Sequence, residues 1–215
     1  MLGEDSVIEL INVWKRYSAT VVLREINLTV KNGEFVSIRG KSGVGKTTLL
    51  KIIGLLELPS EGEVKLFGKS VQKISDDEKS NLRLNHIGFV FQFFNLIPSL
   101  TVLENVELPL ALAGISKHKR REKVLKLLKY FDLANFATRF PETLSGGERQ
   151  RIAVMRALAN NPKIILADEP TSSLDDENSD LLIKLLSSIN REKKVIIMLT
   201  TTDLYEKLPT GRDYL

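Results

Sequence analysis

Short runs in which apolar and polar residues alternate fill the first third of the chain. The runs are rich in Val, Ile and Leu and are separated by Gly, Asn or Pro, so they predict strands. They read VIELINV (7–13), VVLREINLTV (21–30), EFVSIRG (34–40), GEVKLFG (62–68) and HIGFVFQ (86–92). The segment KTTLLKIIGLL (46–56) breaks this pattern with apolar residues at helical spacing.

The rest of the chain predicts helices followed by buried strands. Helical spacing appears in TVLENVELPLALAG (101–114), KVLKLLKYF (123–131), ERQRIAVMRALAN (148–160) and NSDLLIKLLSSI (178–189). KIILADEP (163–170) and KVIIML (194–199) are continuous apolar runs, as in strands that are covered on both faces. Strands of this kind that alternate with helices indicate a parallel sheet covered by helices, and the helical stretch from about 93 to 160 reads as an insertion into it.

Composition narrows the class of protein without identifying it. The 215 residues are 43% hydrophobic and 27% charged, which suits a globular chain of one large domain or two small ones. No apolar run is long enough to span a bilayer, and the start MLGEDSVIEL has acids where a signal peptide has bases, so we expect a cytoplasmic protein. The absence of Cys excludes disulfides and thiolate metal sites, and a metal site built on His86 and His118, the two histidines, is not expected.

The net charge of +4 is small, and most of the local basic charge lies in SKHKRREK (116–123). Such a run suits nucleic acid or anionic lipid, but it also suits the solvated first turn of a helix. We favour the helix and expect no nucleic-acid partner.

A phosphate-binding loop is predicted at GKSGVGKT, which matches G-x-x-x-x-G-K-[ST] in full between a strand and a helix. Gly40, Gly43 and Gly45 let backbone N–H groups turn toward phosphate oxygens, and a side chain at Gly45 is expected to obstruct the phosphates. Lys46 brings a positive charge to the β and γ phosphates, and Thr47 offers a hydroxyl to Mg²⁺. The N-terminus of the following helix adds its partial positive charge.

Two acids end the apolar strand KIILADEP. Asp168 is expected at the sheet edge beside the phosphate-binding loop, where it can hold Mg²⁺ through water. Glu169 can accept the proton of an attacking water.

A second anion site is predicted at LSGGERQR (144–151). Ser145 is a suitable N-cap for the helix that follows. Capping alone does not account for two glycines, because each weakens a helix interior by roughly 1 kcal/mol relative to Ala.

Together these motifs resemble those of the ATP-binding cassette (ABC) ATPases, and GKSGVGKTT, LSGGERQR and IILADEP occur in that family's order. The resemblance covers nearly the whole chain. It implies an α/β P-loop NTPase (RecA-like) parallel sheet core with an N-terminal antiparallel β subdomain and an inserted α-helical subdomain. Residues 1–215 then form one nucleotide-binding domain, with 1–92 and 160–215 as the β subdomain and core and 93–159 as the helical subdomain.

The resemblance also implies roles for residues with weak signals of their own. Tyr17 in KRY sits where the family stacks an aromatic ring on adenine. Gln92 matches a glutamine that reaches Mg²⁺ and the attacking water, and Asp175 in SSLD (172–175) belongs to a loop that crosses between subunits. The expected nucleotide-binding set is Tyr17, Gly40, Lys41, Ser42, Gly43, Val44, Gly45, Lys46, Thr47, Thr48, Ser145, Gly146, Gly147, Glu148 and Asp175. The expected metal set is Thr47, Gln92 and Asp168.

The family works as a head-to-tail dimer with ATP between the subunits. The resemblance therefore implies that ATP on Lys46 of one subunit is capped by Ser145 and Gly147 of its partner, in a homodimer that forms with ATP. The segment GFVFQFFNLIPSLTVLENVELPL looks like the lipoprotein-release and macrolide-export branch, whose ATPases pair with membrane permeases. A permease is expected to dock near Phe93–Pro98, which places the protein on the cytoplasmic face of the membrane.

One departure from the family lies at the end of VIIML. The family has Thr-His-Asp there, and its histidine contacts the γ phosphate. This chain reads Thr201-Thr202-Asp203, so Thr202 takes the place of the histidine, or Thr201 if the register slips by one. We therefore expect an ATPase with slow hydrolysis.

Two other functions stay open. One is an ATP-dependent dimerisation switch that signals to a membrane partner with little turnover. The other is a non-transport cassette ATPase that acts on nucleic acid, although the long coiled coil or second cassette of such proteins is absent from this sequence. A P-loop kinase is less suitable because LSGGERQR has no role in it.

Overall fold

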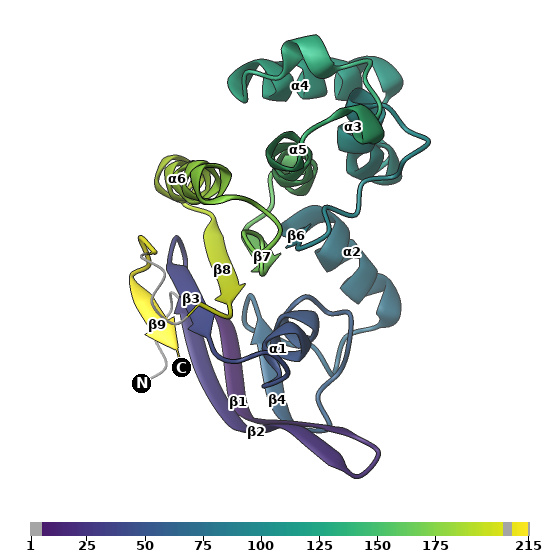
Figure 1. The fold of residues 1–215 in the computed structure, drawn as a ribbon. Helices are drawn as coiled ribbons and strands as arrows, with labels where there is room; N and C mark the ends of the chain where they lie inside the picture. The colour runs from purple at the N-terminus through teal and green to yellow at the C-terminus, as the bar shows by residue number, and fades with distance from the viewer. Residues whose placement is uncertain (1–5, 204–207, 215) are drawn as a thin grey trace.

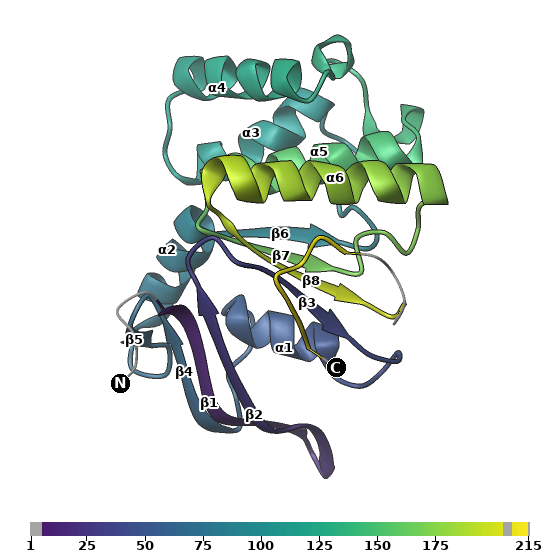
Figure 2. The same ribbon diagram turned by 90° about the vertical axis from the view of Figure 1, so that its left-hand side faces the viewer.

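The N-terminal part of the chain forms an antiparallel sheet. In the computed structural model, which describes residues 6–203 and 208–214, its strand order is β2-β1-β4-β5. The strands are β1 (Ser6–Tyr17), β2 (Thr20–Lys31), β4 (Glu61–Leu66) and β5 (Lys69–Ser70). Figure 2 shows this sheet at the bottom of the molecule, below helix α1 (Lys46–Ile53).

A parallel sheet forms the centre of the molecule, with strand order β6-β7-β8-β3-β9. Its strands are β6 (Ile87–Phe91), β7 (Ile164–Asp168), β8 (Ile196–Thr201), β3 (Phe35–Arg39) and β9 (Arg212–Tyr214). The apolar residues of β7 and β8 are at most 1% exposed, which is why these strands read as unbroken apolar runs.

Helices cover the face of the parallel sheet that is turned away from α1 and the antiparallel sheet (Figures 1 and 2). The longest are α3 (Val102–Leu112), α4 (Lys117–Tyr130), α5 (Gly146–Leu158) and α6 (Asp176–Lys193), and two short 3-10 turns lie at Ala134–Phe136 and Pro141–Thr143. Figure 2 places α5 and α6 directly on the sheet and α4 outermost. Helices α3, α4 and α5 fall within 93–159, and the separation of that segment as a subdomain stays a prediction.

Two apolar cores result from the alternation of side chains along the central strands. Ile165 and Leu199 join the core beneath the helices, whereas Leu166 and Met198 join the core with α1 and the antiparallel sheet. The predicted α/β class, with a parallel core and an N-terminal antiparallel sheet, is confirmed.

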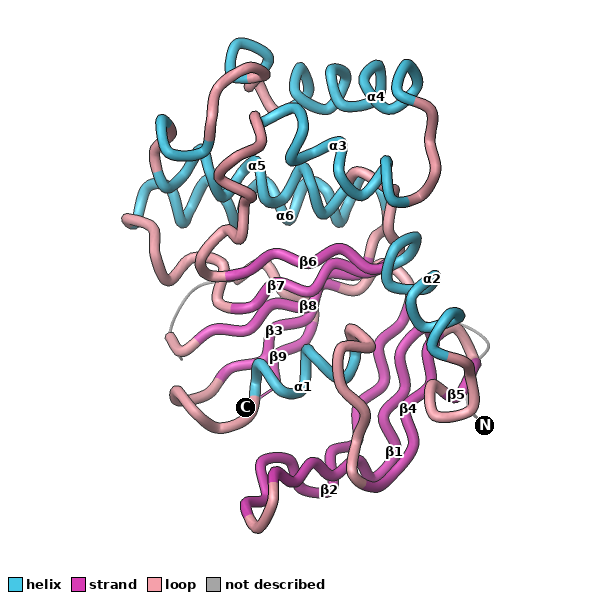
Figure 3. Tube along the Cα trace, turned by 90° about the vertical axis from the view of Figure 1, so that its right-hand side faces the viewer, coloured by secondary structure: helices cyan, strands magenta, loops and turns pink. Residues whose placement is uncertain are grey.

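Helix α2 (Asp76–His86) was not predicted, and Figure 3 shows it at the edge of the antiparallel sheet. Nine of its eleven residues are polar, so it lacks the apolar periodicity that predicts a helix. Its start is instead fixed by a capping box, in which Ser75 and Glu78 exchange side-chain and backbone hydrogen bonds.

Candidate functional site

Four neighbouring strands of the parallel sheet end at one edge, and predicted site residues follow directly after them. Strands β6, β7, β8 and β3 are paired in parallel up to their last residues. The residues immediately beyond these ends are Gln92, Glu169, Thr202 and Gly40. The topology therefore brings together positions that are up to 162 residues apart in the sequence.

The predicted phosphate-binding loop connects β3 to α1 and turns at two glycines with positive φ. Gly43 has a φ of 82° and Gly45 a φ of 108°, a backbone region that suits glycine. A Cβ on Gly45 would lie 2.8 Å from Leu23 Cδ2 and 3.0 Å from the carbonyl oxygen of Val22. The close approach of β2 to the loop thus requires a glycine at position 45. That a side chain at this position would also obstruct the phosphates stays a prediction.

The start of α1 is open to an anion. Gly45 occupies the N-cap and supplies no side-chain hydrogen bond, and no acid lies in the first turn. The first N–H groups of a helix have no partner within it, so they are available to phosphate oxygens.

The side chain of Lys46 folds back onto the loop that precedes it. Its side chain is 4% exposed, and Nζ donates to the carbonyl oxygens of Gly40 at 2.8 Å and Lys41 at 3.1 Å. Nζ also lies 3.3 Å from Oε1 of Glu169. The ammonium group is therefore held at the mouth of the loop, where the phosphates of a nucleotide are expected.

Asp168 is held between two hydroxyl groups. Thr47 Oγ1 donates to Oδ2 at 2.8 Å, and Thr200 Oγ1 donates to Oδ1 at 2.7 Å. Thr47 and Asp168 thus present oxygen atoms side by side, the kind of ligand that Mg²⁺ prefers. Because Mg²⁺ usually takes one or two protein ligands together with phosphate oxygens and water, these two residues fit it.

Glu169 has an uncommon backbone conformation for a residue with a side chain. Its φ is 44°, and its N–H donates to Thr200 Oγ1 at 3.0 Å. Its carboxylate is partly exposed and pairs with Lys46. A carboxylate at this edge has the position expected of a general base, and that role stays a prediction.

Thr202 shares a cavity with Glu169. It is the first residue after β8 and is exposed, whereas Thr201 is buried and its hydroxyl accepts a hydrogen bond from the N–H of Asp203 at 3.1 Å. The cavity has a volume of about 350 Å³ and is lined mainly by hydroxyl and carboxylate side chains. Thr202, rather than Thr201, is the threonine exposed beside Glu169.

Gln92 follows β6 and is partly buried. Its carbonyl oxygen accepts a hydrogen bond from Ser173 Oγ at 2.8 Å, which ties this turn to the segment before α6. Within the described part of the chain its side-chain amide makes no hydrogen bond, and its expected role as a metal ligand stays a prediction.

Ser145 caps α5 as predicted from its residue type. Ser145 Oγ accepts from the N–H of Glu148 at 3.3 Å, and Glu148 Oε2 accepts from the N–H of Ser145 at 2.7 Å. The first turn of α5 therefore forms a capping box. Among the residues that the structure describes, none accepts a hydrogen bond from this hydroxyl, so its hydrogen can be donated to a ligand.

Packing within the chain explains one of the two glycines of LSGG. A Cβ on Gly147 would lie 2.1 Å from Oδ1 of Asn178 in α6, whereas a Cβ on Gly146 would meet nothing closer than 3.6 Å. Asn178 is in turn held by Asp175, the N-cap of α6, whose carboxylate accepts from the N–H of Asn178 at 2.8 Å. This hydrogen bond is the main reason that the pKa of Asp175 lies below its usual value.

Tyr17 ends β1 close to α1. It is 43% exposed, and its hydroxyl donates to Glu57, which raises the pKa of the tyrosine. Lys15 Nζ lies 5.0 Å from the centre of the ring. A stacked base would share the ring with this cation or displace it.

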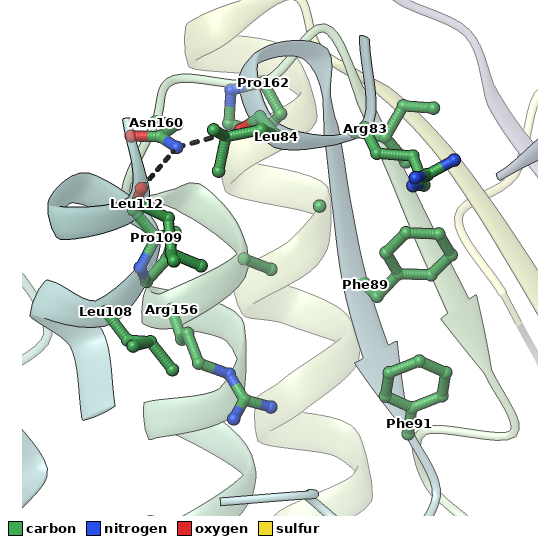
Figure 4. A pocket seen from close by; sticks show the side chains of 13 residues that line it. Arg83, Leu84, Phe89, Phe91, Leu108, Pro109, Leu112, Arg156, Asn160 and Pro162 are labelled. Carbon is green, nitrogen blue, oxygen red and sulfur yellow. Dashed lines mark hydrogen bonds between the residues drawn. The ribbon is translucent and has the colours of Figure 1, made fainter. Parts of the chain in front are cut away.

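A separate apolar groove lies on the helical side of the molecule (Figure 4). It has a volume of about 280 Å³ and is formed by α2, β6, α3 and α5, with Phe89, Phe91, Leu108 and Leu112 among its walls. Its walls end at Phe91 on this stretch of the chain, and the predicted docking segment Phe93–Pro98 begins two residues later, after Gln92.

Arg156 connects the groove to that segment. It lines the groove, and its guanidinium donates to the carbonyl oxygens of Phe94 at 2.9 Å and Asn95 at 2.6 Å. Phe94 and Asn95 both have positive φ, and Phe93 is 73% exposed. Neither Arg156 nor Thr200 was predicted as a functional residue, because Arg156 lies in a segment that predicted only a helix and Thr200 lies between the apolar run VIIML and the departure at Thr201-Thr202-Asp203.

Comparison with known proteins identifies relatives of similar sequence and fold. A family profile described as "ABC transporter" matches residues 23–172. The uncharacterized ABC transporter ATP-binding protein MJ0796 of Methanocaldococcus jannaschii is 47% identical over 206 residues, which cover 92% of this chain and 88% of that protein. A solved structure of MJ0796, described as a dimeric post-hydrolysis state bound to ADP and Pi, superposes with a TM-score of 0.83 at 46% identity and the same coverage.

Other relatives are longer proteins. "ABC transporter H family member 2" of Dictyostelium discoideum is 43% identical, with 97% of this chain covered but 42% of the relative. The macrolide export ATP-binding/permease protein MacB of Chlorobaculum tepidum is 43% identical, with 93% of this chain covered but 31% of the relative. The chain thus spans less than half of the length of these two relatives.

Proposed function

Since this chain belongs to the ABC transporter family, we propose that it binds and hydrolyses ATP to energise a membrane transporter. The observation that carries this proposal is the arrangement of four side chains at one sheet edge. Two contacts join them in pairs: Thr47 Oγ1 lies 2.8 Å from Asp168 Oδ2, and Lys46 Nζ lies 3.3 Å from Glu169 Oε1.

Phosphate binding changes the partners of Lys46. In the structure its ammonium group donates to the carbonyl oxygens of Gly40 and Lys41 and pairs with the carboxylate of Glu169. ATP phosphates at the start of α1 attract the same ammonium group, so Lys46 exchanges Glu169 for phosphate. Glu169 is then released to accept a proton from water.

Hydrolysis follows as an in-line displacement. The water oxygen attacks the γ phosphorus, the bond to the β–γ bridging oxygen breaks, and Glu169 takes the proton of the water. Thr47 and Asp168 are the residues that would hold Mg²⁺, and the bound ion would neutralise charge on the phosphates. The products are ADP and phosphate.

The active form is a homodimer that closes around ATP. The relative MJ0796 has been solved as a dimer with ADP and Pi. Ser145 and the N–H groups of Gly146 and Gly147 face the nucleotide bound to the partner subunit in this proposal. The free hydrogen of the Ser145 hydroxyl supplies a donor to that nucleotide.

The groove of Figure 4 receives a segment of a permease. Its apolar walls suit a short amphipathic helix. Arg156 in α5 donates hydrogen bonds to the carbonyl groups of Phe94 and Asn95. A segment that binds in the groove and displaces Arg156 would therefore move both helix α5 and the turn after Gln92.

Among the described helices, none combines the length and the apolar character needed to cross a membrane. The chain then works at the cytoplasmic face, beside its partner.

Thr202 makes hydrolysis slow in this proposal. It lies beside Glu169 in the shared cavity, where a threonine hydroxyl is shorter than an imidazole and carries no positive charge. The same residue favours a second candidate function, in which ATP binding and dimerisation signal to a membrane partner with little turnover.

Phosphate release at saturating ATP and Mg²⁺ tests the proposal. We expect slow release by the natural chain that disappears in both Lys46→Ala and Glu169→Gln. Equal release by all three proteins would contradict the proposed function. Dimerisation without any release by the natural chain would favour the switch.

A further inference from the structure

The hydroxyl of Thr200 joins the two acidic residues of the site. Thr200 lies in β8, is fully buried and pairs in register with Asp168. Its Oγ1 donates to Asp168 Oδ1 at 2.7 Å and accepts from the backbone N–H of Glu169 at 3.0 Å. A hydroxyl can make both bonds because it has one donor and two acceptor lone pairs.

The first of these bonds fixes the Asp168 carboxylate. Its other oxygen, Oδ2, accepts from Thr47 Oγ1 at 2.8 Å, so a hydroxyl holds each oxygen. Rotation of the carboxylate breaks at least one of these bonds. Thr47 and Thr200 together therefore set the direction in which the remaining lone pairs of the Asp168 carboxylate point.

The second bond fixes the backbone of Glu169. This residue has a φ of 44°, in the left-handed region that residues with a Cβ seldom adopt. The bond from its N–H to Thr200 anchors this turn directly beyond β7. The direction in which the Glu169 side chain leaves the sheet depends on that backbone.

We propose that Thr200 is a positioning residue for ATP hydrolysis. Its hydroxyl orients Asp168 toward Mg²⁺ and holds Glu169 so that the carboxylate faces the attacking water. This inference rests on the proposed function. The proposal gives Thr200 a role distinct from that of Thr202, because Thr200 is buried within β8 whereas Thr202 is exposed beyond its end.

A structural role alone predicts a different result. Thr200 is β-branched and sits in a buried strand, so it also contributes packing. In that case removal of the hydroxyl lowers stability and leaves hydrolysis by the folded protein unchanged. Ser37 provides a matched control, because it is also fully buried in a neighbouring strand and donates to the carboxylate of Asp213, outside the site.

The experiment compares Thr200→Val, Thr200→Ala and Thr200→Ser with Ser37→Ala. Valine keeps the shape of threonine and removes the hydroxyl. The Ala and Ser variants differ from each other only by a hydroxyl, so their comparison decides the question even where Thr200→Val does not fold. Each protein is measured for single-turnover ATP hydrolysis, for ATP affinity with Mg²⁺ and with EDTA, and for its thermal midpoint.

We expect Thr200→Ala to hydrolyse ATP about 10- to 100-fold more slowly than Thr200→Ser, the range for a hydrogen bond to a charged group. It should also need more Mg²⁺ for half-maximal binding of ATP, with affinity in EDTA unchanged. Ser37→Ala should lower the thermal midpoint and keep both the rate and the Mg²⁺ dependence.

Equal rates and equal Mg²⁺ dependence for Thr200→Ala and Thr200→Ser would overturn the proposal. So would a loss of rate in Ser37→Ala as large as that in Thr200→Ala. The natural chain and Lys46→Ala are measured alongside, and equal hydrolysis by those two would count against the proposed function itself.

Discussion

Replacement of Thr202 by histidine is expected to speed ATP hydrolysis and leave ATP affinity unchanged. Thr202 is exposed beyond the end of β8 and shares a cavity of about 350 Å³ with Glu169. A water molecule takes about 30 Å³ in the liquid, so an imidazole can replace several waters there without displacing the backbone. The phosphate-binding loop and its Lys46 contacts are not altered by the change.

The size of the effect follows from the value of one positioned hydrogen-bond donor. Removal of such a donor typically costs about 10² to 10³ in kcat, or roughly 3 to 4 kcal/mol of barrier. Restoring one in Thr202→His should therefore raise kcat at least about tenfold. A substitution at an exposed position changes stability by about 0.5 kcal/mol or less, so the two effects are separable.

Steady-state phosphate release at saturating ATP and Mg²⁺ measures the effect, with Thr202→Leu as a control of similar size that lacks a donor. We expect a faster rate for Thr202→His alone and similar ATP affinities for all three proteins by calorimetry. Brisk turnover by the natural chain, no faster with histidine, would refute the reasoning and show that Thr202 is a neutral departure from the family pattern.

Three further predictions concern the two halves of the nucleotide site. Lys46→Ala should weaken ATP binding by several kcal/mol in calorimetry, because it removes the positive charge from the phosphates, and unchanged affinity would contradict the loop assignment. Ser145→Arg should abolish ATP-dependent dimerisation in size-exclusion chromatography but spare ATP binding, since in the proposed dimer the serine faces only the partner's nucleotide; loss of binding as well would argue against that geometry. Gly147→Ala should lower the free energy of unfolding by about 1 to 3 kcal/mol in urea titrations, because its Cβ would lie 2.1 Å from Asn178 Oδ1. Asn178→Ala should recover part of that loss in the double variant, and an equal loss in both backgrounds would rule out the contact.

The sheet edge could be predicted from sequence because its residues are marked by local patterns. A strand that runs into GKSGVGKT and an apolar strand that ends in Asp168 and Glu169 each have a distinctive form. Parallel strands place their carboxyl ends at one edge, so the two motifs had to meet. The structure brings Thr47 and Asp168 within hydrogen-bond distance, as this logic requires.

Features that depend on contacts between distant segments could not be predicted. The reason for Gly147 lies in Asn178 of another helix, and the importance of Thr200 lies in its register with Asp168. The apolar run at 194–199 predicted a strand, which the structure places at Ile196–Thr201, but it did not show which threonine is buried and which is exposed. Helix α2 was missed because nine of its eleven residues are polar, although Ser75 and Glu78 have the spacing of a capping box.

The groove illustrates the same limit. Its walls come from four elements that are separated along the chain, and no local pattern shows that they meet. The exposed apolar segment after Gln92 could be recognised, whereas the groove beside it and the Arg156 bridge between them required the packing of α5 against β6.

Nucleotide-driven dimerisation of Glu169→Gln tests the central claim most directly. This substitution keeps the shape of the residue and removes the base, so ATP should remain uncleaved between two subunits. Light scattering on a size-exclusion column should give the mass of one 24.2 kDa chain without nucleotide and twice that mass with ATP and Mg²⁺. A single-chain mass at every ATP concentration, with ATP bound, would contradict the account.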